Sequence, residues 1–346
     1  MATLAQVIAG DPRFAGDAIA IGAIREYLMN DQLFNTLEFS PQAMKNSLNK
    51  FEYAYNVFGT KVSDIKARKL GENGVTPSNH VPTTKRVQLG ILSGDFQVDV
   101  EMARGNVSGS ITESGFNNYV VEQMALKMDD LVNGFAIKFI KGDSSNNSGE
   151  FDGLEKLVPS TRVSSTAIDL GDFEYKEAQA ARAKVNAVIN NVKNPNAIIT
   201  TYNGMNYLTS IDARNGIVSA PAIINGVQYA TYGGLIIIPL TTDCFSASEF
   251  TTGEPFYVVR MSENKGLKVV IPNDGKIMLI HDPRTEQSGN RVKTGYVEMN
   301  SAVALNDLLA VYKGYITSST NPLPDSHDNS AWEEEDSPSD SDLGGD

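Results

Sequence analysis

Cysteine, histidine and long apolar runs are scarce or absent in this chain of 346 residues. The one cysteine, Cys244, cannot form a disulfide within the chain, so nothing in the sequence requires an oxidising compartment. No run of 18 apolar residues occurs, which excludes a transmembrane helix of the usual kind. Met1 to Gly10 carries no basic segment before its apolar residues, so we do not expect a secretory signal.

Motifs for catalysis and nucleotide binding are also lacking. The three histidines (His80, His281 and His327) are not accompanied by a nucleophile motif, and Gly-x-Ser-x-Gly does not occur. Neither of the common glycine-rich phosphate loops is present. We therefore predict no catalytic, cofactor-binding or metal-binding residues and a protein that is not an enzyme. An enzyme with an unrecognised site is the remote alternative.

One segment has part of a calcium-binding pattern. Asp143, Ser145 and Asn147 have the first spacings of an EF-hand loop. The sixth position is Ser148 where that loop needs glycine, and the twelfth is Leu154 where it needs glutamate. The pattern therefore indicates a polar turn rather than a metal site.

Negative charge is concentrated at the end of the chain. The formal net charge is −13, and nine carboxylates with no lysine or arginine lie between Asp325 and Asp346. The rest of the chain is only mildly acidic, and no basic face dominates it, which disfavours a protein that reads nucleic-acid sequence. We predict a disordered acidic tail over residues 323–346. The sequence leaves open which side of an assembly this tail would face.

The rest of the chain is organised around one long amphipathic segment. It contains no proline, and its apolar residues follow helical spacing: Phe116, Val120, Met124, Met128, Leu131, Val132, Phe135 and Phe139. This pattern predicts a helix over residues 114–141, which reaches about 40 Å at 1.5 Å per residue. A helix of that length indicates an extended molecule.

The ends of this helix carry recognisable signals. Ser114 is the predicted N-cap, Lys138 and Lys141 suit the negative end of the helix, and Gly142 stops it. Gly134 is the one weak position, about 1 kcal/mol worse than alanine inside a helix. Either it lets the helix bend, or it admits a close neighbour.

The segments before the helix cannot form cores of their own. In residues 1–59, Met44, Leu48, Phe51 and Tyr55 have a spacing that predicts a short helix packed on something else. Residues 60–86 have a local excess of four positive charges around a stretch rich in turn residues, which favours a long hairpin or a surface loop. Residues 87–102 alternate as a strand does.

The segments after the helix predict two further units. A helix from 172 to 192, a strand from 197 to 201, a second helix from about 203 and an apolar strand from 233 to 239 indicate a compact α/β unit with a central sheet. Strands follow at 267–271 and 276–281, and then between 292 and 316 with a bend near Asn306. We expect the long helix to cover the apolar face of these strands, giving an α+β layer.

The order and spacing of these elements resemble the major capsid proteins of tailed bacteriophages, which share the Hong Kong 97 fold with encapsulins. The resemblance is carried by the helix ending in Phe139-Ile-Lys-Gly142-Asp143, by Gly153-Leu154, by Ala197-Ile-Ile-Thr-Thr201, by Gly233-Gly234-Leu-Ile-Ile-Ile and by the closing strands to Tyr315. It covers nearly all of residues 1–320. The resemblance implies these parts: an N-terminal arm (1–59), an extended loop (60–95), a peripheral domain with the spine helix (96–171), an axial domain (172–262), peripheral return strands (263–322) and the acidic tail (323–346).

The resemblance also implies a function, that of a structural subunit of a tailed-phage head. It would self-assemble into an icosahedral shell enclosing double-stranded DNA without sequence-specific binding. Many copies of the chain would associate, with a portal, a separate scaffolding protein and a decoration protein as partners and without a membrane or a cofactor. Only 115 residues precede Phe116, the first residue of the apolar stripe, which leaves no room for a fused scaffolding domain. The implication is a separate scaffolding protein, or none. The expected location is the virion, after assembly in the host cytoplasm. The alternative is an encapsulin-type nanocompartment.

The expected assembly contacts are the cations of the loop and the strand that follows it: Lys66, Arg68, Lys69, Lys85 and Arg86. Some members of the family cross-link subunits through lysine and asparagine. Lys69 or Lys85 would be the candidate lysine here. No asparagine or glutamate of this sequence matches the partners used by the family, so the sequence leaves open whether subunits are cross-linked. Gly134 is the expected point of flexibility in the spine helix.

Overall fold

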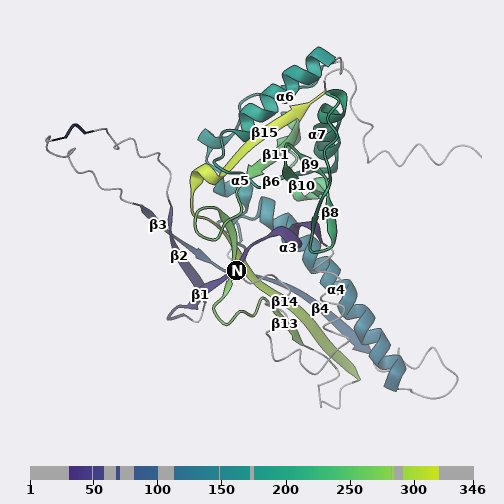
Figure 1. Cartoon of the computed structure of the whole chain (residues 1–346). Helices are drawn as coiled ribbons and strands as arrows, with labels where there is room; N and C mark the ends of the chain where they lie inside the picture. Colours follow the sequence, from purple (N-terminus) through teal and green to yellow (C-terminus); the bar gives the residue numbers. More distant parts are fainter. Residues whose placement is uncertain are drawn as a thin grey trace, which may run out of the picture.

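The computed structural model describes residues 31–48, 50–57, 68–70, 82–99, 113–147, 149–171, 175–281, 283 and 291–318, and in the long helix the side chains from residue 119 onward. The structural statements below concern this part of the chain. Two sheets and one long helix dominate it (Figure 1). No helix within these residues is long and apolar enough to cross a membrane.

The first sheet has seven strands and runs through the middle of the molecule. In spatial order its main path is β13 (Met278–His281), β14 (Val292–Leu305), β12 (Leu267–Pro272), β1 (Phe39–Lys45), β2 (Phe51–Val57) and β3 (Thr83–Gln88), and β4 (Gly90–Asp99) pairs with β14. β1 runs parallel to β12, and the other pairs are antiparallel. The length of β14 lets it pair with β4 and β13 at one end and with β12 at the other.

The second sheet has six strands and forms a separate α/β unit. Its order is β5 (Ile168–Asp169), β15 (Val311–Thr317), β11 (Glu254–Val259), β6 (Ala197–Thr201), β10 (Leu235–Leu240) and β9 (Thr231–Tyr232). Two helices, α6 (Tyr175–Ile189) and α7 (Tyr202–Arg214), pack on one face of it. The other face contributes to the large core that also contains the long helix. Both faces of this sheet are therefore covered.

Short elements complete the fold. They are α3 (Gln32–Thr36), α5 (Leu154–Leu157), the β7–β8 hairpin (Ala222–Ile224 and Val227–Tyr229) and the 3₁₀ turns at Ser160–Arg162, Thr242–Cys244, Glu249–Thr251 and Leu308–Ala310. Asp31 caps α3 by accepting a hydrogen bond from the Phe34 amide at 2.8 Å. Phe34 then packs on Phe135 of the long helix, with ring centroids 4.7 Å apart, so α3 is fastened to the core.

The long helix α4 (Glu113–Lys141) confirms the predicted spine and, from residue 119 onward, its core-facing stripe, whereas the side chain of Phe116 lies outside the described part. It packs on β4 and β14, as expected of a helix that covers a sheet. The stripe is buried at these positions: Val120, Met124, Met128, Leu131, Val132, Phe135 and Phe139. Burial of each such side chain contributes roughly 1.5–3 kcal/mol. The helix begins at Glu113, so the predicted N-cap Ser114 is wrong and lies inside the first turn.

Two glycines fix how the chain leaves the helix. Gly142 follows the last helical residue, and its carbonyl accepts a hydrogen bond from the Gly153 amide at 2.8 Å. A Cβ on Gly142 would lie 2.3 Å from the Phe151 carbonyl oxygen, and one on Gly153 would lie 2.5 Å from the Ile140 carbonyl oxygen. Only glycine permits this backbone approach. The polar turn that follows α4 is thereby folded back against the helix end.

The predicted helix around residues 44–55 is wrong. These residues form β1 and β2, joined by a turn in which the Asn46 side chain accepts hydrogen bonds from the amides of Leu48 and Lys50. An asparagine side chain that accepts hydrogen bonds from backbone amides two and four residues later favours a turn over a helix. The spacing of four residues that suggested a helix also fits every second residue of a strand.

The last strand lies in a different sheet from the one expected. The bend near Asn306 is confirmed by the 3₁₀ turn at Leu308–Ala310, which ends β14. The residues beyond it form β15, which pairs along its length with β11 of the six-stranded sheet rather than continuing beside β14. The turn redirects the chain because Asp307 accepts a hydrogen bond from the Leu309 amide at 2.9 Å.

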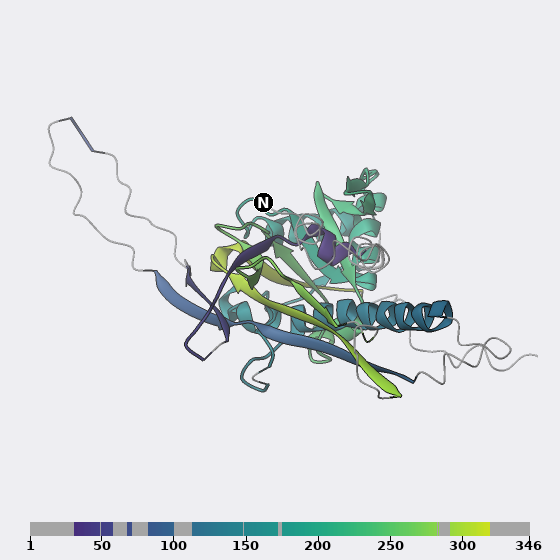
Figure 2. The same ribbon diagram turned by 90° about the horizontal axis from the view of Figure 1, so that it is seen from below.

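The molecule is elongated, as the long helix predicts. β2 and β3 project from one side of the body, while α4 runs along the long strands β4 and β14 toward another side (Figures 1 and 2). In Figure 2 the six-stranded unit lies above the long helix α4, and the outer ends of the long strands β4 and β14 lie below it. The domain boundaries stated from the sequence remain a prediction.

Candidate assembly surface

The projecting strands β2 and β3 form a two-stranded antiparallel ribbon at the edge of the seven-stranded sheet. Their register pairs Tyr53 with Val87 and Tyr55 with Lys85. β3 is the last strand of the sheet order among the described residues, and its side chains are exposed except for half-buried Val87. A strand at a sheet edge presents unpaired backbone groups to any chain that approaches it.

Alternation along the strands places aromatic and basic side chains on one face of this ribbon. We call this the aromatic–basic face and define it by Lys45, Phe51, Tyr53, Lys85 and Val87. The Lys45 ammonium lies 5.2 Å from the centroid of the Phe51 ring. Phe51, Tyr53 and Val87 are only half-buried, and both lysines are exposed. Part of an apolar surface is therefore left open to solvent beside two cations.

A buried lysine two strands away in the same sheet holds one ring of this face. Lys268 of β12 is 2 % exposed, and its ammonium donates hydrogen bonds to Gln42 Oε1 and to the Tyr53 hydroxyl, both at 2.9 Å. Tyr53 also stacks on Tyr55, with ring centroids 5.6 Å apart. Because a buried ammonium needs its hydrogen-bond partners, Tyr53 is held in one orientation. The aromatic–basic face is therefore preorganised.

The predicted contact residues are only partly brought together. Lys85 and Arg86 are neighbours on β3 and point to opposite faces of the ribbon. Arg68 and Lys69 are exposed and lie in a short described stretch beyond β2, whereas Lys66 lies outside the described residues. The sequence analysis missed Lys45, Phe51, Tyr53 and Lys268. Period-two alternation of Phe51, Tyr53, Tyr55 and Val57 was the signal that could have revealed the ribbon.

Gly134 faces open space. Among the described residues of this chain, an added Cβ at this position would meet no atom within 4 Å. Gly134 borders a cleft of about 400 Å³ between α4 and β4, which also contains Ile91, Gly94 and Lys127. Both roles expected of Gly134, a point of helix bending and a position that admits a close neighbour, stay predictions.

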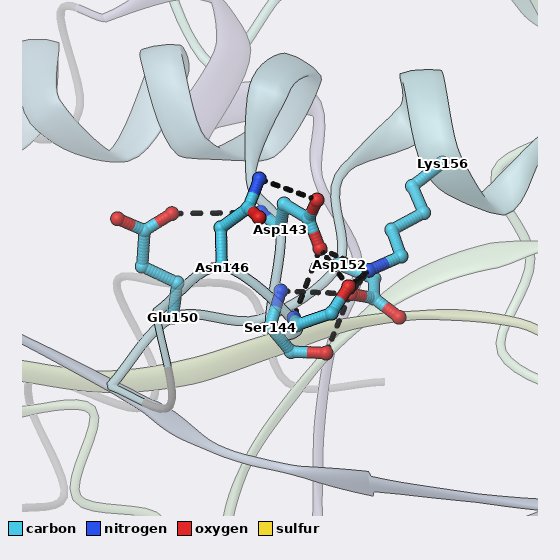
Figure 3. A network of polar contacts seen from close by, with 7 residues as sticks. Asp143, Ser144, Asn146, Glu150, Asp152 and Lys156 are labelled. Carbon is cyan, nitrogen blue, oxygen red and sulfur yellow. Dashed lines mark hydrogen bonds and ion pairs between the residues drawn. The ribbon is translucent and has the colours of Figure 1, made fainter.

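The segment with partial EF-hand spacing is held by a lysine (Figure 3). The Lys156 ammonium pairs with Asp143 and lies 3.3 Å from an oxygen of Asp152. Hydrogen bonds from Lys156 and then from Ser145 hold the pKa of the Asp143 carboxyl well below its usual value. The Lys156 ammonium therefore lies between the Asp143 and Asp152 carboxylates, where a bound metal ion would have to lie. Among the described residues, no group of three or more metal-binding side chains comes together.

The same turn carries a second ion pair. Lys138 near the end of α4 lies 2.6 Å from Glu150. Desolvation raises the pKa of Glu150, but the bonds from Lys138 and from the Asp143 amide outweigh this and lower it overall. The two ion pairs stabilise the turn against the helix end.

A second cleft lies at the carboxyl ends of β6 and β10. It has a volume of about 610 Å³, and its lining includes Lys141, Asn203, Asp243, Phe250 and Glu254. The Glu254 carboxylate already accepts hydrogen bonds from Thr201 at 2.6 Å and from Asn203 at 3.4 Å. These hydrogen bonds between Glu254, Thr201 and Asn203 do not by themselves make a nucleophile and its general base.

The cysteine and the histidines do not form a reactive centre in the described residues. Cys244 is buried, and burial raises the pKa of its thiol, which disfavours the reactive thiolate. His281 ends β13 and stacks on Tyr296, with ring centroids 5.0 Å apart. His80 and His327 lie outside the described residues.

Comparison with solved structures identifies the fold. The chain is similar to the holo-SrpI encapsulin complex from Synechococcus elongatus PCC 7942, with 12% identity, a TM-score of 0.53, and coverage of 84% of this chain and 90% of that one. It is also similar to the capsid of an empty GTA particle, with 11% identity, a TM-score of 0.51, and coverage of 83% and 90%. The sequence matches no protein-family model and no curated protein. The chain has the Hong Kong 97 fold, as the sequence resemblance predicted.

Proposed function

We propose that this chain is the structural subunit of a self-assembling icosahedral shell, the head of a tailed phage that encloses double-stranded DNA. One observation carries the proposal: the ribbon of β2 and β3 projects from the body with half-exposed aromatic rings and an edge strand that the described residues leave unpaired. A projecting ribbon of this kind offers its apolar surface and its edge strand to another copy. The two proteins of similar fold named above are an encapsulin and the capsid of a GTA particle.

The parts of the chain have distinct roles in such a shell. The layer of α4 on β4 and β14 forms the wall, because it is long, rigid and packed on its own core. The ribbon and the expected extended loop (residues 60–95) lie over a neighbouring subunit, where their cations make the assembly contacts. These are the residues proposed from the sequence: Lys66, Arg68, Lys69, Lys85 and Arg86.

The content of the shell separates the two candidate functions. An encapsulin-type nanocompartment is the alternative, supported by the similarity to the encapsulin complex. Both classes use one fold, so the fold does not decide between them. Particles purified from their native source and treated with nuclease would retain protected double-stranded DNA if they are phage heads. They would retain a protein cargo and no protected genome if they are nanocompartments.

The remaining partners follow from the phage proposal. A head needs a portal and either a separate scaffolding protein or none, and a decoration protein would bind its outside. The shell would be part of the virion, assembled in the host cytoplasm. Neither a membrane nor a cofactor has a role in this proposal.

Negative-stain electron microscopy of the expressed chain tests the proposal directly. We expect closed shells of uniform diameter, either from the chain alone or after co-expression with its scaffolding protein. A chain that stays a monodisperse monomer at high concentration under both conditions would contradict the proposal. Such a monomer would return attention to the cleft beside Glu254 as an unassigned binding site.

A further inference from the structure

The aromatic–basic face has a definite chemical character. Among the described residues of β1, β2 and β3 the only carboxylate is Glu52, and strand alternation places it on the opposite face of the ribbon. Glu263 reaches the start of β1, where it accepts hydrogen bonds from Ser40 and Gln42. The face therefore presents Lys45 and Lys85 beside half-buried rings, with no acid on its own strands to neutralise them.

One large apolar side chain lies in the turn that joins β1 and β2, where Leu48 is 75 % exposed. Exposed Met44 is paired with Glu52 and lies on the opposite face of the ribbon. Lys50 stands in the same turn and is exposed. A surface that combines open apolar side chains with clustered cations suits an acidic segment that also carries an apolar anchor.

The chain itself contains such a segment. The last 22 residues hold nine carboxylates and neither lysine nor arginine, and they include Trp332, the only tryptophan of the protein. Three glutamates and an aspartate follow Trp332 directly. Tryptophan is unusual in a stretch of such low apolar content and is the residue type most enriched at binding anchors.

We propose that the acidic tail of a second copy of this chain binds the aromatic–basic face. The Trp332 indole packs against Phe51 and Tyr53, and the flanking carboxylates pair with Lys45 and Lys85. This inference rests on the proposed function, since it gives the ribbon a specific partner within the shell. It adds to the assembly contacts a link that is sensitive to salt, because exposed ion pairs are screened.

The tail leaves the body at a place remote from the face that it is proposed to bind. β15 ends far from β3 across the body, and Ser318 follows it (Figure 1). Trp332 lies 14 residues beyond Ser318, a distance of at most about 50 Å when extended at 3.3–3.6 Å per residue. A tail of that length can extend well beyond the surface of its own subunit.

A labelled peptide tests the contact whether or not shells form. The peptide comprises residues 325–346 with a fluorescent dye, and its anisotropy is followed on titration with the full-length chain. We expect saturable binding that weakens as salt rises. Binding should weaken about tenfold in Lys45→Glu with Lys85→Glu, as the loss and reversal of two exposed ion pairs predicts. A peptide with Trp332→Ala should also bind more weakly.

The matched control is Lys184→Glu, the same charge change at an exposed position of α6. It should bind the peptide as the unmodified chain does. Equal binding by the ribbon variant and by this control would overturn the proposal, and so would binding that Trp332→Ala leaves unchanged. Displacement of the peptide by short nucleic acids at equimolar concentration would reassign the face to nucleic acid.

Tryptophan fluorescence tests the same contact in assembled particles. Trp332 is the only tryptophan, so intrinsic emission reports the tail alone. We expect blue-shifted emission protected from acrylamide in particles, and a return to water-like emission in the Lys45→Glu, Lys85→Glu variant. Particles with water-like emission from the start would overturn the docking while leaving the shell intact. Failure to form particles would count against the shell, and the peptide titration would still decide the docking.

Discussion

The six-stranded unit and the β2–β3 ribbon bury their apolar surface in opposite ways. In the six-stranded unit the central strand β6 is buried at every residue, with α6 and α7 on one face and the large core on the other. In the ribbon, only Tyr55 and Val57 of the two strands are buried. Among the described residues, the first region is enclosed by its own chain, and the second keeps part of its aromatic surface exposed.

This difference teaches which changes should affect folding and which should affect assembly. A residue enclosed by its own chain contributes to the free energy of unfolding of the subunit. A residue that becomes buried only against a neighbour contributes to association instead. Four predictions test the comparison, beginning with the largest expected effect.

Phe256→Ala in β11 should lower the free energy of unfolding of the subunit by about 3–5 kcal/mol, because the ring is fully buried in the core of the six-stranded unit. Phe51→Ala in the ribbon is the matched change of a half-buried ring, and it should cost the isolated subunit much less. Denaturant unfolding of both variants measures the difference. Equal losses would mean that the ribbon belongs to the folding core.

Lys85→Glu combined with Arg86→Glu should raise the protein concentration needed for assembly about tenfold or more, since both side chains are exposed on the edge strand and reversal opposes docking. The free energy of unfolding should change by no more than about 0.5 kcal/mol, as for other surface substitutions. Light scattering follows assembly, and denaturant unfolding follows stability. Normal assembly of this variant would remove β3 from the contact.

Gly134→Ala should stabilise the subunit by about 0.5–1 kcal/mol, because the added methyl group meets open space and alanine favours the helix. If Gly134 lets the spine helix bend between immature and expanded shells, the same variant should slow or block expansion. Thermal unfolding measures the first effect, and electron microscopy of particles before and after expansion measures the second. Unchanged expansion and helix curvature would reject the bending role.

Acidification should weaken the polar turn after α4, with the smallest effect of the four. The pKa values of Asp143 and Glu150 are lowered in the folded chain, so their stabilisation is present above the usual carboxyl pKa values of 3.8 and 4.5 and is lost as the pH falls below them. The contribution is small because the Asp143 pair is exposed. Lys156→Met should flatten the pH dependence of the unfolding temperature between pH 6 and pH 3. A slope equal to that of the unmodified chain would contradict the assignment.

The interior of the fold was largely predictable from local patterns. The spine helix was predicted to within one residue at its start because its apolar stripe and its terminal Gly142 are both local signals. The same holds for β6, where the predicted and observed bounds agree. The ribbon was missed because Met44, Leu48, Phe51 and Tyr55 have helical spacing, and this was preferred to the period-two alternation of Phe51, Tyr53, Tyr55 and Val57.

The amino-acid sequence by itself determined the long helix, the two sheet-forming regions and the separation of charge between ribbon and tail, since each depends on the periodicity or composition of a short segment. The tertiary structure alone decided that β15 pairs with β11 and that buried Lys268 donates a hydrogen bond to the Tyr53 hydroxyl. It also decided that Gly134 faces open space. These features depend on contacts between residues far apart in the chain, which no local pattern encodes.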